Sequence, residues 1–329
     1  MHPDRSSTMR LRPLAAALAL IIPAMAGAQS GAYPNKPVRF LVPFAPGGTT
    51  DIIARMVGQK VGEELGAQFV VDNRGGGGGT IGTDLTAKAA PDGYTIMLNH
   101  VGLTYNVTLY RKLPYDTLKD LMPVSLVGIT PNVLVLNNAA PVKSVRDLVD
   151  IAKAKPGQIA FGSGGVGSAA HLSVAMFEQY SGTKFLHVPY KGAGPALTDT
   201  IGGQVQFMIA TMPAAVGHIR GGKLRAVAVS GAKRSPAFPD LPTIAEAGVK
   251  GYEYETWYGI LAPAGTPKPI FDRILGATHK ALGQKELRER LQQSGMEPET
   301  NTPAQFAALI KTDIARWAKI IKSAGIEAQ

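Results

Sequence analysis

The sequence predicts an α/β protein of two domains, between which the chain crosses twice. Three observations carry this prediction. The chain has 329 residues, which exceeds the size at which one hydrophobic core stops growing. Short β-branched runs alternate with helical patterns, and such alternation is typical of parallel sheets flanked by helices. No Ser/Gly-rich linker divides the chain, so we expect it to leave the first domain, build the second and return.

Each expected strand is a short run rich in β-branched and aromatic residues. Most of these runs lie next to a helical pattern, as they do in βα units. The first run, 38–42, has the sequence Val-Arg-Phe-Leu-Val. The expected strands are 38–42, 69–71, 95–98, 133–136, 158–161, 186–188, 205–209 and 226–229.

The expected helices repeat apolar residues at intervals of three or four positions. In 52–65, for example, Ile53, Val57 and Val61 share one stripe with the spacing of an amphipathic helix. The two helical patterns at the C-terminal end are long. The expected helices are 52–65, a segment starting at 81, 145–154, 169–180, 196–201, 269–293 and 303–324.

The middle of the chain has its own strand and helix series, and the two ends must pack together. We therefore place the crossings near 127–132 and near 248–255. Domain 1 then comprises 31–130 plus 252–329, and domain 2 comprises 131–251. Two crossing segments form a hinge, which suits closure of a cleft between the lobes around a ligand.

The N-terminal segment predicts export. Three arginines precede an apolar run at 14–25, and small-x-small sites follow at 24–26 and 26–28. This order is typical of a secretory signal peptide, here 1–28, which is removed in the mature protein. A membrane anchor is the alternative. The run is shorter than the roughly 20 residues that span a bilayer, and Pro23 interrupts it.

Composition narrows the classes of partner. The chain has no cysteine, so neither disulfides nor a lipid on an N-terminal cysteine can hold it. Its formal net charge is +10, but the Lys and Arg residues are scattered singly, so we expect no nucleic acid partner. A mild preference for anionic ligands is the better interpretation. We also expect no metal, no cofactor and a monomeric protein.

The first candidate binding loop is 43–51, which has the sequence Pro-Phe-Ala-Pro-Gly-Gly-Thr-Thr-Asp between an expected strand and helix. Glycines there free backbone N–H groups to face a cleft, and the N-terminus of the following helix favours negative charge. Asp51 is placed to cap the first turn of that helix. The alternative is a tight βα turn without a binding function.

The second candidate loop, 161–168, also lies between an expected strand and helix. Gly162, Gly164 and Gly167 satisfy the G-x-G-x-x-G pattern of dinucleotide-binding proteins. We reject a dinucleotide because the next strand ends without an Asp or Glu for the ribose. Backbone amides and serine hydroxyls that hold a short anion fit this loop better.

The remaining motifs do not indicate phosphate binding, catalysis or metal binding. A glycine run at 75–79 lacks the lysine of a phosphate-binding loop and is interpreted as structural. Neither a G-x-S-x-G elbow nor an H-E-x-x-H motif occurs. Ser168 and His171 are spaced so that an exported hydrolase could pair them, but a histidine in the first turn of a helix more often caps or packs. The histidines show no metal-ligand spacing.

Taken together, these motifs resemble the Bug family, the TctC-like substrate-binding receptors of tripartite tricarboxylate transporters. The resemblance runs from Tyr33 to the C-terminus, and the ordered set of motifs is specific although each one alone is weak. The motifs are Tyr33-Pro34, 42–48 (VPFAPGG), 91–94 (PDGY), 113–116 (LPYD), 161–168 (FGSGGVGS), 188–192 (VPYKG), 240–243 (DLPT) and 263–267 (PAGTP).

The resemblance implies the two-domain periplasmic binding-protein fold, which closes on a ligand. It also implies that backbone amides and ordered waters of the two candidate loops hold a ligand carboxylate. Carried over by position, the ligand-binding residues are Phe44, Pro46, Gly47, Gly48 and Thr49 on domain 1, and Ser163, Gly167, Ser168, Ala169, Tyr190 and Thr211 on domain 2.

Two segments depart from the family pattern. Many members have an Asp-Asn-containing segment where this chain has 210–213, Ala-Thr-Met-Pro. Met212 then suggests a more apolar end of the ligand near Thr211. After the strand at 95–98, members often carry small hydroxyl residues where this chain has Asn99 and His100.

The expected function is therefore a periplasmic solute-binding protein. It would capture a small organic acid, a carboxylate, and deliver it to the membrane subunits of a transporter. A ligand sensor of the same fold that acts on a signalling partner is the first alternative, and an exported hydrolase is the second. Which carboxylate is bound stays open at this point.

Overall fold

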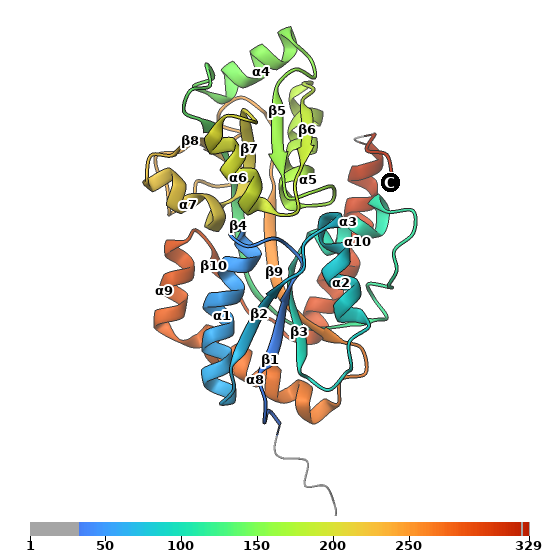
Figure 1. Ribbon diagram of the computed structural model, residues 1–329. Helices are drawn as coiled ribbons and strands as arrows, with labels where there is room; N and C mark the ends of the chain where they lie inside the picture. Colours follow the sequence, from blue (N-terminus) through green and yellow to red (C-terminus); the bar gives the residue numbers. More distant parts are fainter. Residues whose placement is uncertain (1–32, 324, 329) are drawn as a thin grey trace, which may run out of the picture. The chain divides into compact units, whose positions relative to one another are not determined.

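The computed structural model describes residues 33–323 and 325–328 (Figure 1). The expected signal peptide, 1–28, lies outside these residues. Tyr33–Gln329 form one compact unit. Among the described residues, no helix is both long enough and apolar enough to cross a membrane.

The expected strands are present, some of them displaced by one or two residues, and β4 is much longer than expected. The strands are β1 Val38–Val42, β2 Phe69–Asn73, β3 Thr95–His100, β4 Leu121–Asn137, β5 Ala160–Ser163, β6 Leu186–Pro189, β7 Phe207–Thr211, β8 Leu224–Val229, β9 Glu255–Pro263 and β10 Glu297–Pro298. The helices are α1 Thr49–Leu65, α2 Thr80–Ala87, α3 Gly102–Leu109, α4 Val145–Ala154, α5 Ala169–Ser181, α6 Ala193–Gly202, α7 Met212–Arg220, α8 Lys268–Gly283, α9 Lys285–Gln293 and α10 Pro303–Ser323.

The strands form one sheet with the order β2-β1-β3-β9-β4-β7-β5-β6, to which β8 and β10 add by pairing with β4. β1 is parallel to β2 and β3, and β5 is parallel to β6 and β7. β9 is antiparallel to β3 and β4, and β4 is antiparallel to β7. The expected parallel pairs are therefore present in both parts of the sheet, and β4 and β9 add antiparallel pairs that were not expected. β4 and β9 carry the chain across and back, so they run in opposite directions.

β4 divides the sheet into two parts. Leu121–Pro131 pair with β9, whereas Asn132–Leu136 pair with β7. We call β1, β2, β3, β9, β10 and 121–131 the first half-sheet, and β5–β8 with 132–137 the second half-sheet (Figure 1). The point at which β4 changes its pairing strand from β9 to β7 falls within the expected crossing at 127–132. β9 starts at Glu255, within the expected return crossing at 248–255. These pairings support the domain boundaries, which stay a prediction.

Local signals explain where the helices next to the half-sheets begin and end. α1 ends at Gly66, whose φ of 71° is the left-handed conformation that closes a helix. α4 begins after Ser144, whose side chain accepts a hydrogen bond from the Asp147 N–H at 3.0 Å. The apolar stripe of α1 packs into one core cluster with β1 and α8. That packing fixes the N-terminus of α1 against the end of β1.

The elements α3, α7, β9 and β10 were not expected. Two differences from the expected pattern have identifiable reasons. The helix expected over 269–293 is divided into α8 and α9, because Gln284 has the extended conformation with ψ of 128°. β9 was not expected at all. Its sequence includes Gly259, which is uncommon inside strands, but a Cβ there would collide with the Phe306 ring. The glycine thus lets α10 pack closely on β9.

Candidate functional site

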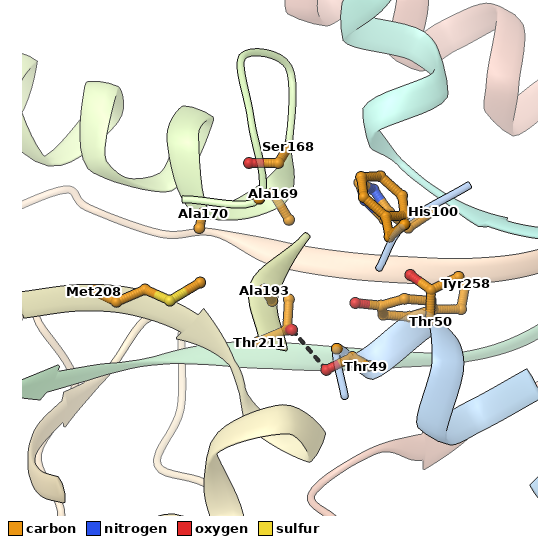
Figure 2. Close-up of a pocket in the computed structure, with 13 residues that line it drawn as sticks. Thr49, Thr50, His100, Ser168, Ala169, Ala170, Ala193, Met208, Thr211 and Tyr258 are labelled. Carbon is orange, nitrogen blue, oxygen red and sulfur yellow. Dashed lines mark hydrogen bonds between the residues drawn. The ribbon is translucent and has the colours of Figure 1, made fainter. Parts of the chain in front are cut away.

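A small cavity lies where loops of the first half-sheet meet loops of the second (Figure 2). Its volume is about 30 Å³. One water needs roughly 10–15 Å³ on this measure, so the space suits about two waters. The lining residues are Phe44, Gly48, Thr49, Thr50, His100, Gly164, Ser168, Ala169, Ala170, Ala193, Met208, Thr211 and Tyr258.

The N-terminal ends of four helices reach this cavity. Thr49 and Thr50 open α1, Ala169 opens α5, and Ala193 opens α6. Thr211 is the residue that precedes α7. The first N–H groups of a helix have no partner within the helix, and the helix dipole is positive at this end. Four such ends around one cavity favour an anion.

No lining residue is Lys, Arg, Asp or Glu. The polar groups that the lining offers are therefore the hydroxyls of Thr49, Thr50, Ser168, Thr211 and Tyr258, the His100 ring and backbone amides. Burial raises the pKa of the Tyr258 hydroxyl, which keeps it protonated. The arrangement can thus solvate a negative charge with neutral donors but cannot neutralise it with a side-chain cation.

The first candidate loop is held by a carboxylate. The Gly47 N–H donates to Asp51 Oδ2 at 3.0 Å, with Gly47 at a φ of 80° that favours glycine. Asp51 Oδ1 lies 2.9 Å from Arg55 Nη2, so an ion pair balances the buried carboxylate. The expected capping of the first helical turn by Asp51 is not what the contact shows, because its carboxylate accepts the N–H of Gly47, which precedes the N-cap residue Gly48. Asp51 fixes the loop and does not line the cavity.

The second candidate loop is held by imidazoles. Ser163 Oγ lies 2.6 Å from His187 Nε2, and the Gly167 N–H donates to His171 Nδ1 at 3.3 Å. The two histidine rings stack with centroids 4.4 Å apart, and Phe161 stacks on His187 at 4.7 Å. Burial lowers the pKa of His171 to about 3 and that of His187 to about 4. Both rings are consequently neutral at pH 7.

The two half-sheets contact one another directly beside the cavity. Thr49 Oγ1 and Thr211 Oγ1 share a hydrogen bond of 2.6 Å (Figure 2). Thr49 Oγ1 also accepts the Ala214 N–H at 3.0 Å. Nearby, the Ala45 N–H donates to the Lys191 carbonyl at 2.9 Å. The structure is therefore in a closed arrangement, in which the cavity is bounded by both halves.

Glycines permit this close approach. A Cβ on Gly194, in the first turn of α6, would collide with the Pro46 carbonyl of the first loop. A Cβ on Gly78, within the glycine run, would collide with the Val166 carbonyl of the second loop. The glycine run thus packs against the second half of the molecule, which supports the structural role expected for it.

The sequence-predicted site residues fall into two groups. Those that line the cavity are Phe44, Gly48, Thr49, Ser168, Ala169 and Thr211. Those that lie outside the lining are Pro46, Gly47, Ser163, Gly167 and Tyr190.

The second group supports the loops or lines another groove. Gly47, Ser163 and Gly167 make the loop hydrogen bonds described above. The Tyr190 hydroxyl donates to Asp199 Oδ2 at 2.7 Å, and its ring lines a neighbouring groove with Lys191. Ligand contact by any of the eleven predicted residues stays a prediction.

Sequence reasoning did not place several lining residues at the site. Met208 lines the cavity, whereas Met212 is fully buried outside the lining. The sequence therefore indicated an apolar side chain near Thr211 but named the wrong methionine. The sequence could have placed Ala193 at the site, because it follows Gly192 and lies between the expected strand 186–188 and the expected helix 196–201. No sequence pattern could have placed Tyr258 at the site, because it lies on the unexpected strand β9.

The geometry at Ser168 differs from that of a hydrolase. Its Oγ accepts the backbone N–H of His171 at 3.4 Å, which is the helix-capping role. The His171 ring is engaged with Gly167 and His187. The capping and packing interpretation of these two residues is confirmed by these contacts.

Comparison with known protein families gives a match over most of the chain. The family model "Tripartite tricarboxylate transporter family receptor" matches residues 53–326. Protein BugT of Bordetella pertussis is 41% identical over 295 residues, which cover 89% of this chain and 90% of that protein. A UPF0065 protein encoded between tcbD and tcbE in Pseudomonas sp. is 38% identical over 321 residues, covering 97% of this chain and 96% of its own.

Solved structures of related proteins have the same overall fold as this chain. The periplasmic binding protein BugD has a TM-score of 0.88 at 37% identity, covering 90% of this chain and 100% of its own. Rpa4515 of R. palustris with adipate has a TM-score of 0.87 at 38% identity, with coverage of 90% and 100%. MatC of Rhodopseudomonas palustris with bound malate has a TM-score of 0.84 at 33% identity, with coverage of 88% and 100%. The predicted fold class is confirmed by these similarities.

Proposed function

This chain belongs to the tripartite tricarboxylate transporter receptor family, and on that premise we propose that it is a periplasmic receptor for a small organic carboxylate. It would hold the carboxylate in the cavity between the half-sheets and deliver it to the membrane subunits of a tripartite transporter. The observation that carries this proposal is the convergence of four helix N-termini on a cavity with no charged side chain in its lining.

Neutral donors are sufficient to bind such an anion. A hydrogen bond to a charged group contributes roughly 1.5–3 kcal/mol, about twice a neutral one. Two or three such bonds from α1, α5 and the hydroxyls would contribute roughly 3–9 kcal/mol, and the upper part of this range corresponds to micromolar affinity. Similar proteins with adipate and with malate support a carboxylate as the ligand class. Both of these acids carry two carboxylates and differ in length.

Binding requires the cavity to open and to enlarge. Space for about two waters does not admit a dicarboxylate, so the two half-sheets must separate before a ligand enters. We infer that 31–130 plus 252–329 and 131–251 move as two domains about β4 and the return to β9. A ligand that contacts both domains then favours a closed state in which the loops meet as they do here, at Gly194 and Pro46, while the side chains that line the cavity make room for it.

Export follows from the N-terminal pattern. We propose that 1–28 is cleaved after Ala26 or Ala28, which releases the mature protein into the periplasm. Mass spectrometry of the periplasmic fraction should then find a chain that starts at Gly27 or Gln29. A mature protein that retains 14–25 would contradict export with cleavage.

Ligand binding is testable with the purified mature chain. We expect at least one acid from a panel of adipate, malate, citrate, benzoate and nicotinate to raise the melting temperature by mass action. Adipamide, which has the length of adipate without its charges, is the matched control and should give no shift. Recovery of the acid unchanged separates a receptor from a hydrolase. If no carboxylate on the panel binds, or if adipamide binds as well as adipate, the proposal is wrong.

A further inference from the structure

His100 is the polar side chain of the cavity that the binding scheme above leaves unused. It is the last residue of β3, 4% exposed, and it lines the cavity. Its ring stacks on Phe44 with centroids 4.8 Å apart and an interplanar angle of 17°, and meets the edge of Tyr258 at 5.7 Å. These two contacts hold the imidazole in one position at the wall of the first half-sheet.

The hydrogen bonds of His100 define which ring nitrogen carries the proton. Its Nδ1 accepts the Gly102 N–H at 2.8 Å. Because a neutral imidazole has one acceptor nitrogen and one donor nitrogen, the proton lies on Nε2. Burial lowers the pKa of His100 to about 3, so the ring stays neutral at pH 7. A Cβ on Gly102 would collide with the ring, so a glycine is needed beside it.

The Nε2–H group is left without a partner. Among the described residues, the ring makes one hydrogen bond, the one from Gly102 to Nδ1. A donor in the lining of a cavity that lacks a protein acceptor is free to bond a ligand, and a site built to hydrogen-bond a ligand oxygen discriminates against ligands that lack it. Figure 2 shows His100 and the apolar Met208 well separated along the lining. The cavity therefore has a donor end and an apolar end.

We propose that His100 determines specificity: its Nε2–H donates to an acceptor oxygen of the ligand other than the carboxylate held by the helix N-termini. This inference rests on the proposed function and deepens it. The ligand class it indicates is a carboxylic acid with a second carboxylate, carbonyl or hydroxyl oxygen. The donor is neutral, so it selects for an acceptor oxygen and does not demand a second charge.

Two substitutions each keep one hydrogen-bonding group of the His100 ring and remove the other, the Nδ1 acceptor or the Nε2–H donor. In His100→Asn, the amide oxygen takes the place of Nδ1 and can accept from Gly102, but the donor at the Nε2 position is lost. In His100→Gln, the amide nitrogen reaches the Nε2 position and keeps the donor, while the bond from Gly102 is lost. A specificity role predicts that Gln rescues binding and Asn does not. A merely structural role predicts the reverse.

The test measures affinities by calorimetry for adipate and hexanoate, and for malate and butyrate, where each second acid has one carboxylate and no second oxygen-bearing group. Wild type should prefer the dicarboxylate of the pair it binds. His100→Asn should weaken that dicarboxylate by about 10- to 100-fold, the loss of one hydrogen bond to a charged group. It should leave the monocarboxylate nearly unchanged, and His100→Gln should retain most of the preference.

Each outcome decides between the two proposals. If wild type binds a monocarboxylate of the earlier panel but no dicarboxylate, this inference falls while the receptor function stands; if it binds no acid of that panel, both fall. If wild type binds a dicarboxylate and His100→Asn binds it equally well, or loses both members of a pair equally, His100 does not select the ligand while the receptor function stands. Should either variant fail to fold, the ¹⁵N resonance of Nε2 in wild type decides. It should shift on addition of adipate or malate, whichever binds, and an unchanged resonance overturns the inference.

Discussion

The two loops that face each other across the cavity have the same design and different supports. Each consists of glycines between a strand and a helix N-terminus, after β1 in one case and after β5 in the other. The first is fixed by the Asp51–Arg55 ion pair. The second is fixed by neutral, stacked His171 and His187. The comparison teaches that two glycine loops of the same design can be held in place by side chains of different chemistry.

The same comparison explains why no charged side chain enters the cavity. In the first loop, the carboxylate of Asp51 is turned toward Gly47 and Arg55 and away from the lining. In the second loop, no ionised group is involved, because burial keeps both imidazoles neutral at pH 7. An anion in the cavity therefore meets donors without competing charges. The predictions that follow each disturb one side of this arrangement.

The largest effect is expected from preventing the loops from meeting. In Gly194→Ala, the added Cβ would collide with the Pro46 carbonyl of the opposite loop in the closed state only. Affinity for adipate or malate should fall roughly 100-fold or more, because the closed population is lost. The melting temperature without ligand should not fall, since Ala favours a helix over Gly. Gly202→Ala on the same helix meets open space and is the matched control. Equal affinities for the two variants would contradict this account.

The next effect concerns the hydroxyl at the start of α5. Ser168→Ala removes both a lining hydroxyl and the cap of the helix. We expect affinity to fall by about 10- to 100-fold and stability to fall by about 1 kcal/mol. Ser144→Ala removes an equivalent cap from α4, outside the cavity lining. It should cost similar stability without affecting affinity, as calorimetry can show. Wild-type affinity in Ser168→Ala would remove Ser168 from the site.

The support of the second loop should make stability depend on pH. The folded-state pKa values of His171 and His187 lie below the unfolded value of 6.5, at about 3 and about 4. The unfolded chain therefore takes up protons first, and stability is complete above pH 6.5 and declines as pH falls toward 4. Each histidine should contribute roughly 2 kcal/mol of this loss by pH 5. Denaturant titrations measure it. His187→Gln should show a shallower decline, and an identical slope would contradict this role.

The smallest effect is expected at the hydrogen bond between the half-sheets. Thr211→Val removes the bond to Thr49 and leaves Thr49 bonded to Ala214. The closed state should lose about 0.5–1.5 kcal/mol, so affinity should fall by about 2- to 10-fold. A role of Thr211 through this bond alone predicts an equal loss for adipate and malate. Thr200→Val, whose hydroxyl bonds only within α6, is the control. A loss confined to one acid would mean that Thr211 contacts ligand.

The sequence was sufficient to locate both loops and the helices that follow them, α1 and α5, because strand, glycines and helix follow one another locally. It did not predict α7, the fourth helix whose N-terminus reaches the cavity. Gly47 and Gly167 have positive φ angles, 80° and 79°, which glycine adopts without strain, so glycines at these positions indicate turns. The half-sheet crossing near Asn132 was also predictable from the separate strand series in the middle of the chain. Such features depend on neighbouring residues along the chain.

Features that depend on distant residues were not predictable. The bond between Thr49 and Thr211 joins positions 162 residues apart. The contact between Gly194 and Pro46 likewise arises only when the loops meet. Tyr258 was missed because its strand lies between β3 and β4 and contains a glycine that only the packing of α10 explains. Tertiary packing, and not local preference, determines these positions.

The central claim is that the half-sheets close around an anion held by helix N-termini, and small-angle scattering tests it most directly. The mature wild-type chain should show a smaller radius of gyration with saturating adipate or malate, whichever binds, than without it. Gly194→Ala should stay at the larger value under the same conditions. Wild type that binds the acid with an unchanged radius of gyration, either already compact or still extended, would contradict the account.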